Sequence, residues 1–379
     1  MEFATKAIHV GQEPDKTTGA TIVPIYETST YTQPAPGQHL GYDYSRTINP
    51  TRVALERCLA SLENAQHGLA FASGMAATAA TMNLLSAGDH VVVTDDLYGG
   101  TFRLFDKVLA RYGLTFSYVD ATDTRNVEAA MRKNTRMVWM ETPTNPLMKI
   151  VDIAAIASLS KAWEALLAID NTFATPYLQN PIDLGADVVV HSTTKYIGGH
   201  SDAIGGFVAM NRDDLFQTVK FHQNSVGGVP GPFDCFLTLR GAKTLALRMR
   251  EHERNARAVA VYLAGRTDIE KLYYPGLPTH PGHDVAKRQM RGFGGMISFI
   301  PSGGAARAKA IAMATKIFSL AESLGGVESL ICHPVSMTHG AIPHDVREAR
   351  GVNDALLRLS VGIEAEADII ADLDQALKS

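Results

Sequence analysis

Cysteine is scarce in this chain, at three of 379 residues, and the three are Cys58, Cys235 and Cys332. An odd, scattered set excludes a disulfide scaffold and a zinc knuckle, and is typical of a reducing compartment. Lysine and arginine form no block, and the formal net charge is −4. We therefore expect a cytoplasmic protein, and neither a nucleic acid nor an anionic membrane surface as its partner.

Long hydrophobic runs are also lacking. The first fifteen residues carry four charges, so we expect no signal peptide. The one long uncharged stretch, 65–88, is interrupted by glycine and hydroxyl residues, which predicts a helix packed tightly inside the protein and not a transmembrane helix. Glycine and proline occur at ordinary frequency, and 46% of the residues are hydrophobic. The chain can therefore bury large cores.

Short β-branched segments alternate with segments of helical periodicity between about residues 65 and 210. The predicted strands are 91–94, 115–119, 137–140, 166–169 and 188–190, and the predicted helices are 75–86, 101–112, 125–133 and 152–163. Such alternation predicts an α/β fold with a mainly parallel sheet covered on both faces.

Long amphipathic helices follow at 244–264, at 305–318 and in the last fifteen residues, with strands at 296–300 and 356–361. They indicate a smaller C-terminal α/β domain. The first 50 residues have no periodicity and resemble an extended arm that needs another surface. We predict an arm at 1–50, a larger domain at 51–240 and a C-terminal domain at 241–379.

Polar side chains follow four of the predicted strands, at the end where each strand finishes. They are Asp95 to Tyr98, Glu141 to Pro146, Asp170 with Asn171, and His191 to Lys195. One such group alone would be read as a cap or a turn. Because ligands of open α/β sheets bind beyond the carboxyl ends of the strands, four groups at one edge predict an active site.

Ser73, Gly74 and Met75 begin a predicted helix and form a candidate anion site. Ser73 can cap the helix and Gly74 allows a ligand close to the backbone, although an ordinary N-cap is the alternative. A helix terminus offers only about half a positive charge, so a phosphate would also need a cation and hydroxyls, which Ser192 and Thr194 could supply. The glycine motifs of dinucleotide and P-loop sites are absent from the sequence.

Lys195 and Asp170 are the candidate reactive groups. Lys195 follows an apolar strand among Ser, Thr and Gly residues, so it is either a surface lysine or a Schiff-base nucleophile. Asp170 ends the run Leu-Leu-Ala-Ile-Asp and is expected to be largely buried. A buried carboxylate needs a partner, and a protonated pyridine nitrogen would serve.

Competing interpretations are weaker. The stretch 192–195 also fits the S-x-x-K motif of serine acyl-transfer enzymes, but neither K-T-G nor S-D-N follows it. The histidines at 280 and 283, and at 333, 339 and 344, lack the spacing of a helical zinc site, so no metal is expected. A non-enzymatic scaffold would leave the four polar strand ends as a coincidence.

Ordered motifs run along nearly the whole chain. They are 42–46 (YDYSR), 49–52 (NPTR), 73–75 (SGM), 96–101 (DLYGGT), 141–146 (ETPTNP), 170–173 (DNTF), 191–200 (HSTTKYIGGH), 323–330 (SLGGVESL), 337–339 (MTH) and 358–364 (RLSVGIE). In these motifs the chain resembles the pyridoxal-phosphate enzymes of cysteine and methionine metabolism, the trans-sulfuration enzymes. The resemblance implies a fold-type I, aspartate-aminotransferase-like fold with pyridoxal 5′-phosphate as cofactor.

The resemblance also implies roles for single residues. Lys195 is expected to bind the cofactor as a Schiff base, Asp170 to pair with its pyridine nitrogen, and Tyr98 to stack on its ring and shuttle a proton. The residues expected to hold the phosphate are Ser73, Gly74, Met75, Ser192 and Thr194, with Tyr44 and Arg46 reaching in from a neighbouring subunit. The implied assembly is a homotetramer, a dimer of dimers with shared active sites.

The substrate side is also implied by the resemblance. Arg358 is expected to grip the α-carboxylate of an amino-acid substrate, with Asn145 and Ser336 supporting the cofactor ring and that carboxylate. Glu328 matches the acidic position of enzymes that handle the distal amino group of cystathionine at Cγ, both γ-lyases and γ-synthases, and Asp43 is expected to help it.

Within the family we expect α,γ-elimination of L-cystathionine to cysteine, 2-oxobutanoate and ammonia, as in cystathionine γ-lyases. Methionine γ-lyases usually have cysteine where this chain has Gly100, so that activity is disfavoured. Cystathionine β-lyase activity is also less expected than γ-lyase activity. Asp43 stands where γ-lyases more often have Glu, and it leans toward the alternative, a cystathionine γ-synthase that joins cysteine to an O-acyl-homoserine.

Overall fold

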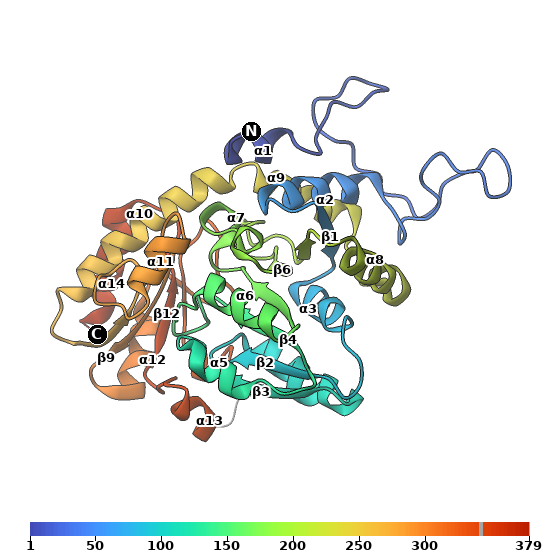
Figure 1. Ribbon diagram of the computed structural model, residues 1–379. Helices are drawn as coiled ribbons and strands as arrows, with labels where there is room; N and C mark the ends of the chain where they lie inside the picture. The colour runs from blue at the N-terminus through green and yellow to red at the C-terminus, as the bar shows by residue number, and fades with distance from the viewer. Residues whose placement is uncertain (341–343, 379) are drawn as a thin grey trace.

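Two β-sheets organise the chain, and the computed structural model describes residues 1–340 and 344–378 (Figure 1). The larger sheet has the strand order β1-β7-β6-β5-β4-β2-β3, and the smaller has β10-β11-β12-β9-β8. The strands are β1 (His67–Phe71), β2 (His90–Thr94), β3 (Thr115–Val119), β4 (Thr135–Glu141), β5 (Leu166–Asp170), β6 (Val188–Ser192), β7 (Gly206–Met210), β8 (Ile269–Tyr273), β9 (Met296–Pro301), β10 (Ser319–Leu320), β11 (Leu330–Cys332) and β12 (Leu357–Ser360).

Helices cover both sheets. They are α1 (Phe3–His9), α2 (Pro50–Leu62), α3 (Gly74–Met82), α4 (Gly99–Arg103), α5 (Thr124–Ala130), α6 (Ile153–Ala162), α7 (Thr175–Leu178), α8 (Asp213–His222), α9 (Pro232–Ala242), α10 (Leu245–Ala264), α11 (His283–Gln289), α12 (Gly304–Ala314), α13 (His344–Ala349) and α14 (Glu366–Leu377). Among the described residues, no helix is both long enough and apolar enough to cross a membrane.

The predicted parallel sheet is confirmed. The pairs β2–β3, β2–β4, β4–β5 and β5–β6 are all parallel, and β7 runs antiparallel to both of its neighbours, β6 and β1. Alternate residues of one strand enter different cores: Leu167 and Ile169 pack on one face, and Ala168 packs on the other. The inner strands β2, β4, β5 and β6 are mostly buried on both faces and carry apolar runs, which is why the sequence revealed them, whereas the edge strand β3 is only partly buried.

The predicted helix at 75–86 is confirmed as α3, whereas the first part of the uncharged stretch 65–88 forms strand β1, which was not predicted. Short apolar runs do not distinguish helix from strand by periodicity. Strand β1 is defined by its antiparallel pairing with β7, in which His67 lies opposite Met210. The partner is about 140 residues away in the sequence, so no local pattern shows it.

Four predicted helices differ in extent, among them α3, which ends at Met82 and not at residue 86, and α5, which ends at Ala130 and not at residue 133. The segment 101–112 is helical but broken, since α4 gives way to a π-helical turn at Leu104–Val108 and a 3₁₀ turn at Leu109–Tyr112. Helix α12 ends at Ala314 and not at residue 318. There the Asp372 carboxylate accepts hydrogen bonds from three successive backbone N–H groups, of residues 316–318, and turns the chain into β10. The last helix, α14, is confirmed, although Ser379 lies outside the described residues.

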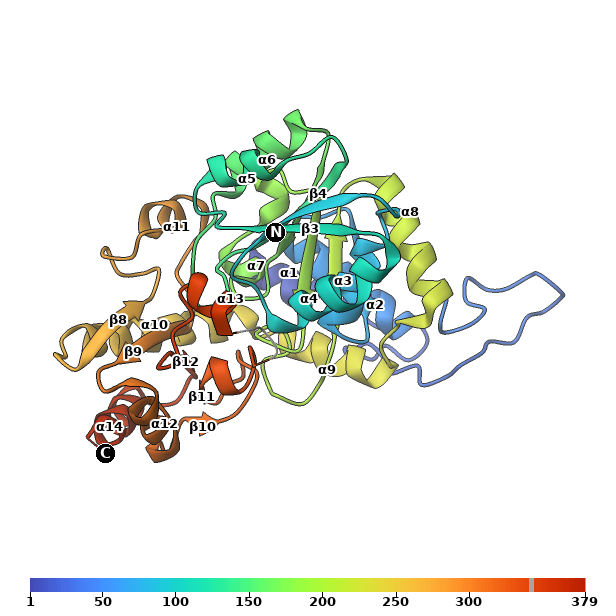
Figure 2. The same ribbon diagram turned by 90° about the horizontal axis from the view of Figure 1, so that it is seen from below.

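The predicted N-terminal arm is only partly an arm. Helix α1 packs on its own chain, where Ala7 is fully buried and Lys6 Nζ donates to Asn64 Oδ1 at 2.8 Å. The loop between α1 and α2 does stand away from the body, as the blue segment in Figure 1 and Figure 2 shows. This projecting loop carries Tyr44 and Arg46.

Candidate active site

A cavity of about 700 Å³ lies at the carboxyl ends of strands β4, β5 and β6, with its other wall formed by the smaller sheet and its loops. Eleven of the fifteen predicted site residues line it. They are Ser73, Gly74, Met75, Tyr98, Asn145, Asp170, Ser192, Thr194, Lys195, Glu328 and Arg358. The sheet edge predicted from the polar strand ends is therefore one wall of a real cavity.

Lys195 follows β6 and points toward the smaller sheet, where its Nζ donates to Ser323 Oγ at 2.8 Å. Burial, and then the charge of Arg358, lower the pKa of Lys195 to about 8, while Glu322 acts in the opposite direction. An ammonium with a pKa near 8 releases its proton far more readily than an ordinary lysine. Lys195 is therefore suited to act as a nucleophile and as a base.

Arg358 on β12 is the second cation of the cavity and is only 2% exposed. One guanidinium nitrogen donates to Asn145 Oδ1 at 2.7 Å, and another donates to Ser323 O at 3.1 Å. Both contacts are with neutral oxygen atoms, so the positive charge stays available to an anion in the cavity. A bidentate pair with a carboxylate is the partner that a guanidinium prefers.

Ser323 touches both cations, through its hydroxyl and through its carbonyl oxygen. Its φ is +88°, a left-handed backbone conformation that is uncommon for a residue with a side chain. Such strain is found where the surrounding structure imposes it, often at functional sites. The sequence analysis gave Ser323 no role, because a sequence indicates a positive φ only where it has a glycine.

Asp170 ends β5 in the cavity wall, with its Oδ1 accepting from Thr172 N at 3.0 Å. Burial raises the pKa of Asp170, against the opposing effects of Thr172 and of the nearby His191. A cation beside this carboxylate would favour its ionised form. The environment of Asp170 therefore suits a protonated ring nitrogen as its partner.

Glu141 lies beside Asp170, since the two residues are partners in the β4–β5 register. Burial and the Asp170 carboxylate raise the pKa of Glu141 well above its usual range. Glu141 Oε2 accepts from the backbone N–H of Tyr98 at 3.0 Å, and the Tyr98 side chain is 39% exposed. This contact fixes the start of the turn that places the Tyr98 ring in the cavity. The sequence motif contained Glu141, but no role was assigned to it.

The start of α3 forms the far end of the cavity. Ser73 Oγ accepts from Ala76 N at 3.0 Å, so the simple N-cap interpretation of Ser73 is confirmed. The same helix terminus lies beside Ser192 and Thr194 in the cavity wall. Backbone N–H groups at a helix N-terminus together with two hydroxyl groups suit a phosphate.

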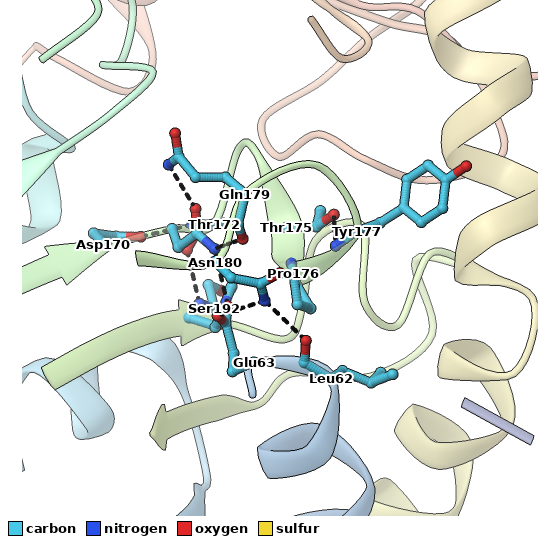
Figure 3. A network of polar contacts seen from close by, with 12 residues as sticks. Leu62, Glu63, Asp170, Thr172, Thr175, Pro176, Tyr177, Gln179, Asn180 and Ser192 are labelled. Carbon is cyan, nitrogen blue, oxygen red and sulfur yellow. Dashed lines mark hydrogen bonds and ion pairs between the residues drawn. The ribbon is translucent and has the colours of Figure 1, made fainter. Parts of the chain in front are cut away.

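A buried polar layer lies beneath these strand ends (Figure 3). Glu63, which follows α2, accepts from His191 Nε2 at 2.5 Å, from Asn171 Nδ2 at 2.9 Å and from Asn180 Nδ2 at 3.3 Å. His191 precedes Ser192 and Asn171 follows Asp170, so one carboxylate anchors the neighbours of two cavity residues. On the cavity side, Ser192 N donates to Thr172 Oγ1 at 2.9 Å.

Four predicted site residues do not line the cavity. Tyr44 and Arg46 border a separate cavity of about 350 Å³, next to which the Arg46 guanidinium lies 5.5 Å from the Tyr44 ring centre. Asp43 accepts from Tyr44 N at 2.7 Å in the projecting loop. Ser336 is exposed and hydrogen-bonded to His333 at 2.7 Å, whereas Ser323 contacts Lys195 and Arg358 in the cavity.

Asp95 and Asp96 belong to a predicted strand end, but they support the scaffold and not the cavity wall. Asp95 pairs with Lys149 at 3.0 Å. Asp96 is buried, and its carboxylate accepts from the Thr144 hydroxyl and from Leu147 N. These contacts hold the loop after β4, which carries Asn145.

The comparisons with known proteins agree with this geometry. The pattern of the Cys/Met metabolism PLP-dependent enzymes matches residues 4–378. The chain belongs to this family. Pyridoxal 5′-phosphate is therefore its cofactor, and the chain is a carbon–sulfur lyase of the trans-sulfuration group.

Close relatives have different activities. A cystathionine beta-lyase from Coxiella burnetii is 52% identical over 98% of this chain and 97% of its own. A cystathionine gamma-synthase from Mycobacterium bovis is 54% identical over 99% and 96%. The structure of a cystathionine gamma-lyase from Lactobacillus plantarum, complexed with L-serine, is 50% identical with a TM-score of 0.98, and covers 100% of this chain and 99% of that one. These similarities establish the family. They do not distinguish between the lyase and synthase reactions, so the specific reaction has to be argued from the residues of the site.

The residues present fit the cofactor. The cavity offers the Lys195 amine, whose pKa is low, and the Asp170 carboxylate, which forms no ion pair among the described residues of the cavity wall. It also offers the accessible aromatic ring of Tyr98 and a helix N-terminus with hydroxyl groups beside it. These are the complements of an aldehyde, a pyridine nitrogen, a flat ring and a phosphate.

The low pKa of Lys195 leads to a prediction. Only the neutral amine can combine with an aldehyde, so the rate at which the cofactor-free protein takes up pyridoxal 5′-phosphate should rise with pH, with a midpoint at about 8. Stopped-flow absorbance across a pH series measures this rate. Arg358→Leu should move the midpoint upward, because it removes a neighbouring positive charge. A midpoint above about 10 in the unmodified protein, as for an ordinary lysine, would contradict the assignment.

Proposed function

We propose that the protein is a cystathionine γ-lyase, and the observation that carries the proposal is a pair of carboxylates in the cavity wall. Glu322 and Glu328 both line the cavity, on the side formed by the smaller sheet, and the Glu322 carboxylate is near enough to Lys195 to oppose the lowering of its pKa. The Glu328 carboxylate accepts a hydrogen bond from the Ser201 hydroxyl. Cystathionine has a second ammonium group several bonds from the reacting carbon, and a carboxylate suits it.

The turn after Tyr98 supports the same choice. A Cβ atom at Gly100 would lie 2.3 Å from the Tyr98 ring, so any side chain there would displace the ring. Methionine γ-lyases usually have cysteine at this position. The close approach of Gly100 therefore supports a Tyr98 placement that differs from theirs.

The proposed steps assign one task to each residue. The bound cofactor supplies an electron sink that makes the substrate Cα proton acidic. Arg358 holds the α-carboxylate, and Asp170 stabilises positive charge on the ring nitrogen. Lys195 Nζ would take the Cα proton, pass it to the bound cofactor and, neutral again, take a Cβ proton; the Cγ–S bond then breaks while the Tyr98 hydroxyl gives its proton to the departing sulfur. With one water consumed, the products are cysteine, 2-oxobutanoate and ammonia.

A cystathionine γ-synthase is the second candidate, favoured by Asp43. The same residues could expel the acyloxy group of an O-acyl-homoserine and admit cysteine in its place. Purified enzyme should be assayed for 2-oxobutanoate from cystathionine, and for cystathionine from cysteine with O-succinyl- or O-acetyl-homoserine. The proposal expects the first rate to exceed the second. A synthase rate well above the lyase rate would replace the proposal with the alternative.

We also propose that the projecting loop completes the site of a neighbouring copy in a homotetramer. Tyr44 is 45% exposed, Arg46 is exposed, and neither lines the cavity of its own chain. A phosphate at the start of α3 needs a cation, and Arg46 of a neighbour would supply it. The position of the loop in Figure 2, away from the body, supports this arrangement.

Subunit mixing tests this assembly. Arg46→Ala and Lys195→Ala proteins should each be nearly inactive, because one lacks the phosphate cation and the other the nucleophile. A mixed oligomer should recover part of the activity, since some sites then combine an intact Arg46 with an intact Lys195. A mixed oligomer confirmed by native mass spectrometry and no more active than its parents would rule out shared sites.

Variants of the two carboxylates test whether they bind the distal ammonium group of cystathionine. We expect Glu328→Gln to lower kcat/KM for cystathionine about fivefold, the effect of one partly exposed ion pair, and to change homocysteine turnover much less. Glu322→Gln is the matched variant on the same wall, and a selective loss there would show that both carboxylates contribute. Equal losses on both substrates in both variants would show that these residues support the fold or the cofactor and do not read the distal ammonium.

A further inference from the structure

Helix α10 has a buried polar face that none of the assigned roles explains. Arg248, His252 and Asn255 lie on it at helical spacing, and they are 4%, 0% and 0% exposed. Buried polar side chains in a helix are costly unless their hydrogen bonds are made. All three donate to backbone carbonyl oxygens of other segments. Figure 1 shows α10, in yellow, running from beside α9 toward the smaller sheet.

Arg248 holds the turn that follows Lys195. Its guanidinium donates to Tyr196 O at 2.6 Å, to Ile197 O at 3.2 Å and to Gly241 O at 2.8 Å. Gly199 has a φ of +70°, and a Cβ atom there would lie 2.1 Å from Arg248 Nη1. The turn is therefore packed directly onto the guanidinium, and its backbone cannot shift while Arg248 stays in place.

His252 and Asn255 hold the chain that follows Arg358. His252 Nδ1 donates to Val361 O at 2.7 Å, and Asn255 Nδ2 donates to Gly362 O at 3.1 Å and to Glu364 O at 2.9 Å. These acceptors lie three to six residues beyond Arg358, at the end of β12. The His252 ring also packs edge-on against Tyr196, with ring centres 5.0 Å apart.

One helix face therefore contacts the two segments that carry the cations of the cavity. We propose that this face sets the distance between Lys195 and Arg358, with Arg248 as a positioning residue for Lys195 and Asn255 as a positioning residue for Arg358. The inference rests on the proposed function only through the roles of these two cations toward cofactor and substrate carboxylate. None of the α10 side chains lines the cavity, so they act through the backbone.

Arg248 and Asn255 contact different segments, so their variants should have different binding defects. Arg248→Met removes the donors that hold the Lys195 turn, so cofactor binding should weaken about tenfold while carboxylate binding changes less than about twofold. Asn255→Leu frees the chain after Arg358, so carboxylate binding should weaken about tenfold while cofactor binding changes less than about twofold. Arg248→Lys, which keeps a donor, should restore part of the cofactor affinity.

Binding titrations of the full-length protein measure both effects. Pyridoxal 5′-phosphate is titrated into cofactor-free protein, and L-alanine, which has the α-carboxylate but no sulfur, is titrated into the cofactor-bound protein and followed by visible absorbance. Tyr262→Phe is the matched control, because it removes a hydrogen bond of the same helix, to Asp374 Oδ1 at 2.9 Å, away from both segments. It should change neither affinity.

The proposal requires that the Arg248 variant weakens mainly cofactor binding and that the Asn255 variant weakens mainly carboxylate binding. If both variants weaken both ligands by similar factors, or change neither while lowering the unfolding temperature, then α10 only stabilises the fold and the proposal is wrong. Arg248→Lys and Asn255→Ser repeat the comparison if the larger changes prevent folding. L-alanine binding does not depend on which sulfur compound is cleaved, so a wild-type protein inactive on cystathionine would overturn the proposed function without affecting this test.

Discussion

Ser323 accepts hydrogen bonds from the two cations of the cavity, and the chemistry of the site depends on that arrangement. Lys195 comes from the larger sheet and Arg358 from the smaller one, and bringing them together lowers the pKa of the lysine. A carboxylate between them would neutralise the pair and hold the lysine protonated. Ser323 offers only neutral oxygen atoms, so Lys195 stays reactive and Arg358 stays able to bind an anion.

The two sheets divide the remaining work. The ends of β4, β5 and β6 and the start of α3 carry the groups that complement the cofactor, and the smaller sheet carries Arg358 and the carboxylates Glu322 and Glu328. Substrate specificity can therefore change in the smaller part without disturbing the cofactor wall. Relatives about 50% identical to this chain carry both lyase and synthase names.

Much of this arrangement could be predicted from local patterns. Four of the five parallel strands were visible because they are mostly buried on both faces, and the polar residues after them were visible because each follows an apolar run. The edge strand β3 is only partly buried and was visible through its β-branched and aromatic residues. Features that depend on distant partners were not visible. Strand β1 exists through its pairing with β7, and Ser323 has its role through a positive φ and two contacts from other segments. Asp96 has the pattern of a site residue, but a threonine hydroxyl and a backbone N–H occupy its carboxylate.

The position of bond cleavage is the most direct test of the account. Cystathionine has sulfur on the γ-carbon of one half and on the β-carbon of the other, so the products report which half Arg358 and Lys195 hold. Mass spectrometry of the products that the cofactor-bound enzyme forms from L-cystathionine should show 2-oxobutanoate and cysteine. Pyruvate and homocysteine as the main products would show cleavage at the β-carbon and would contradict the account.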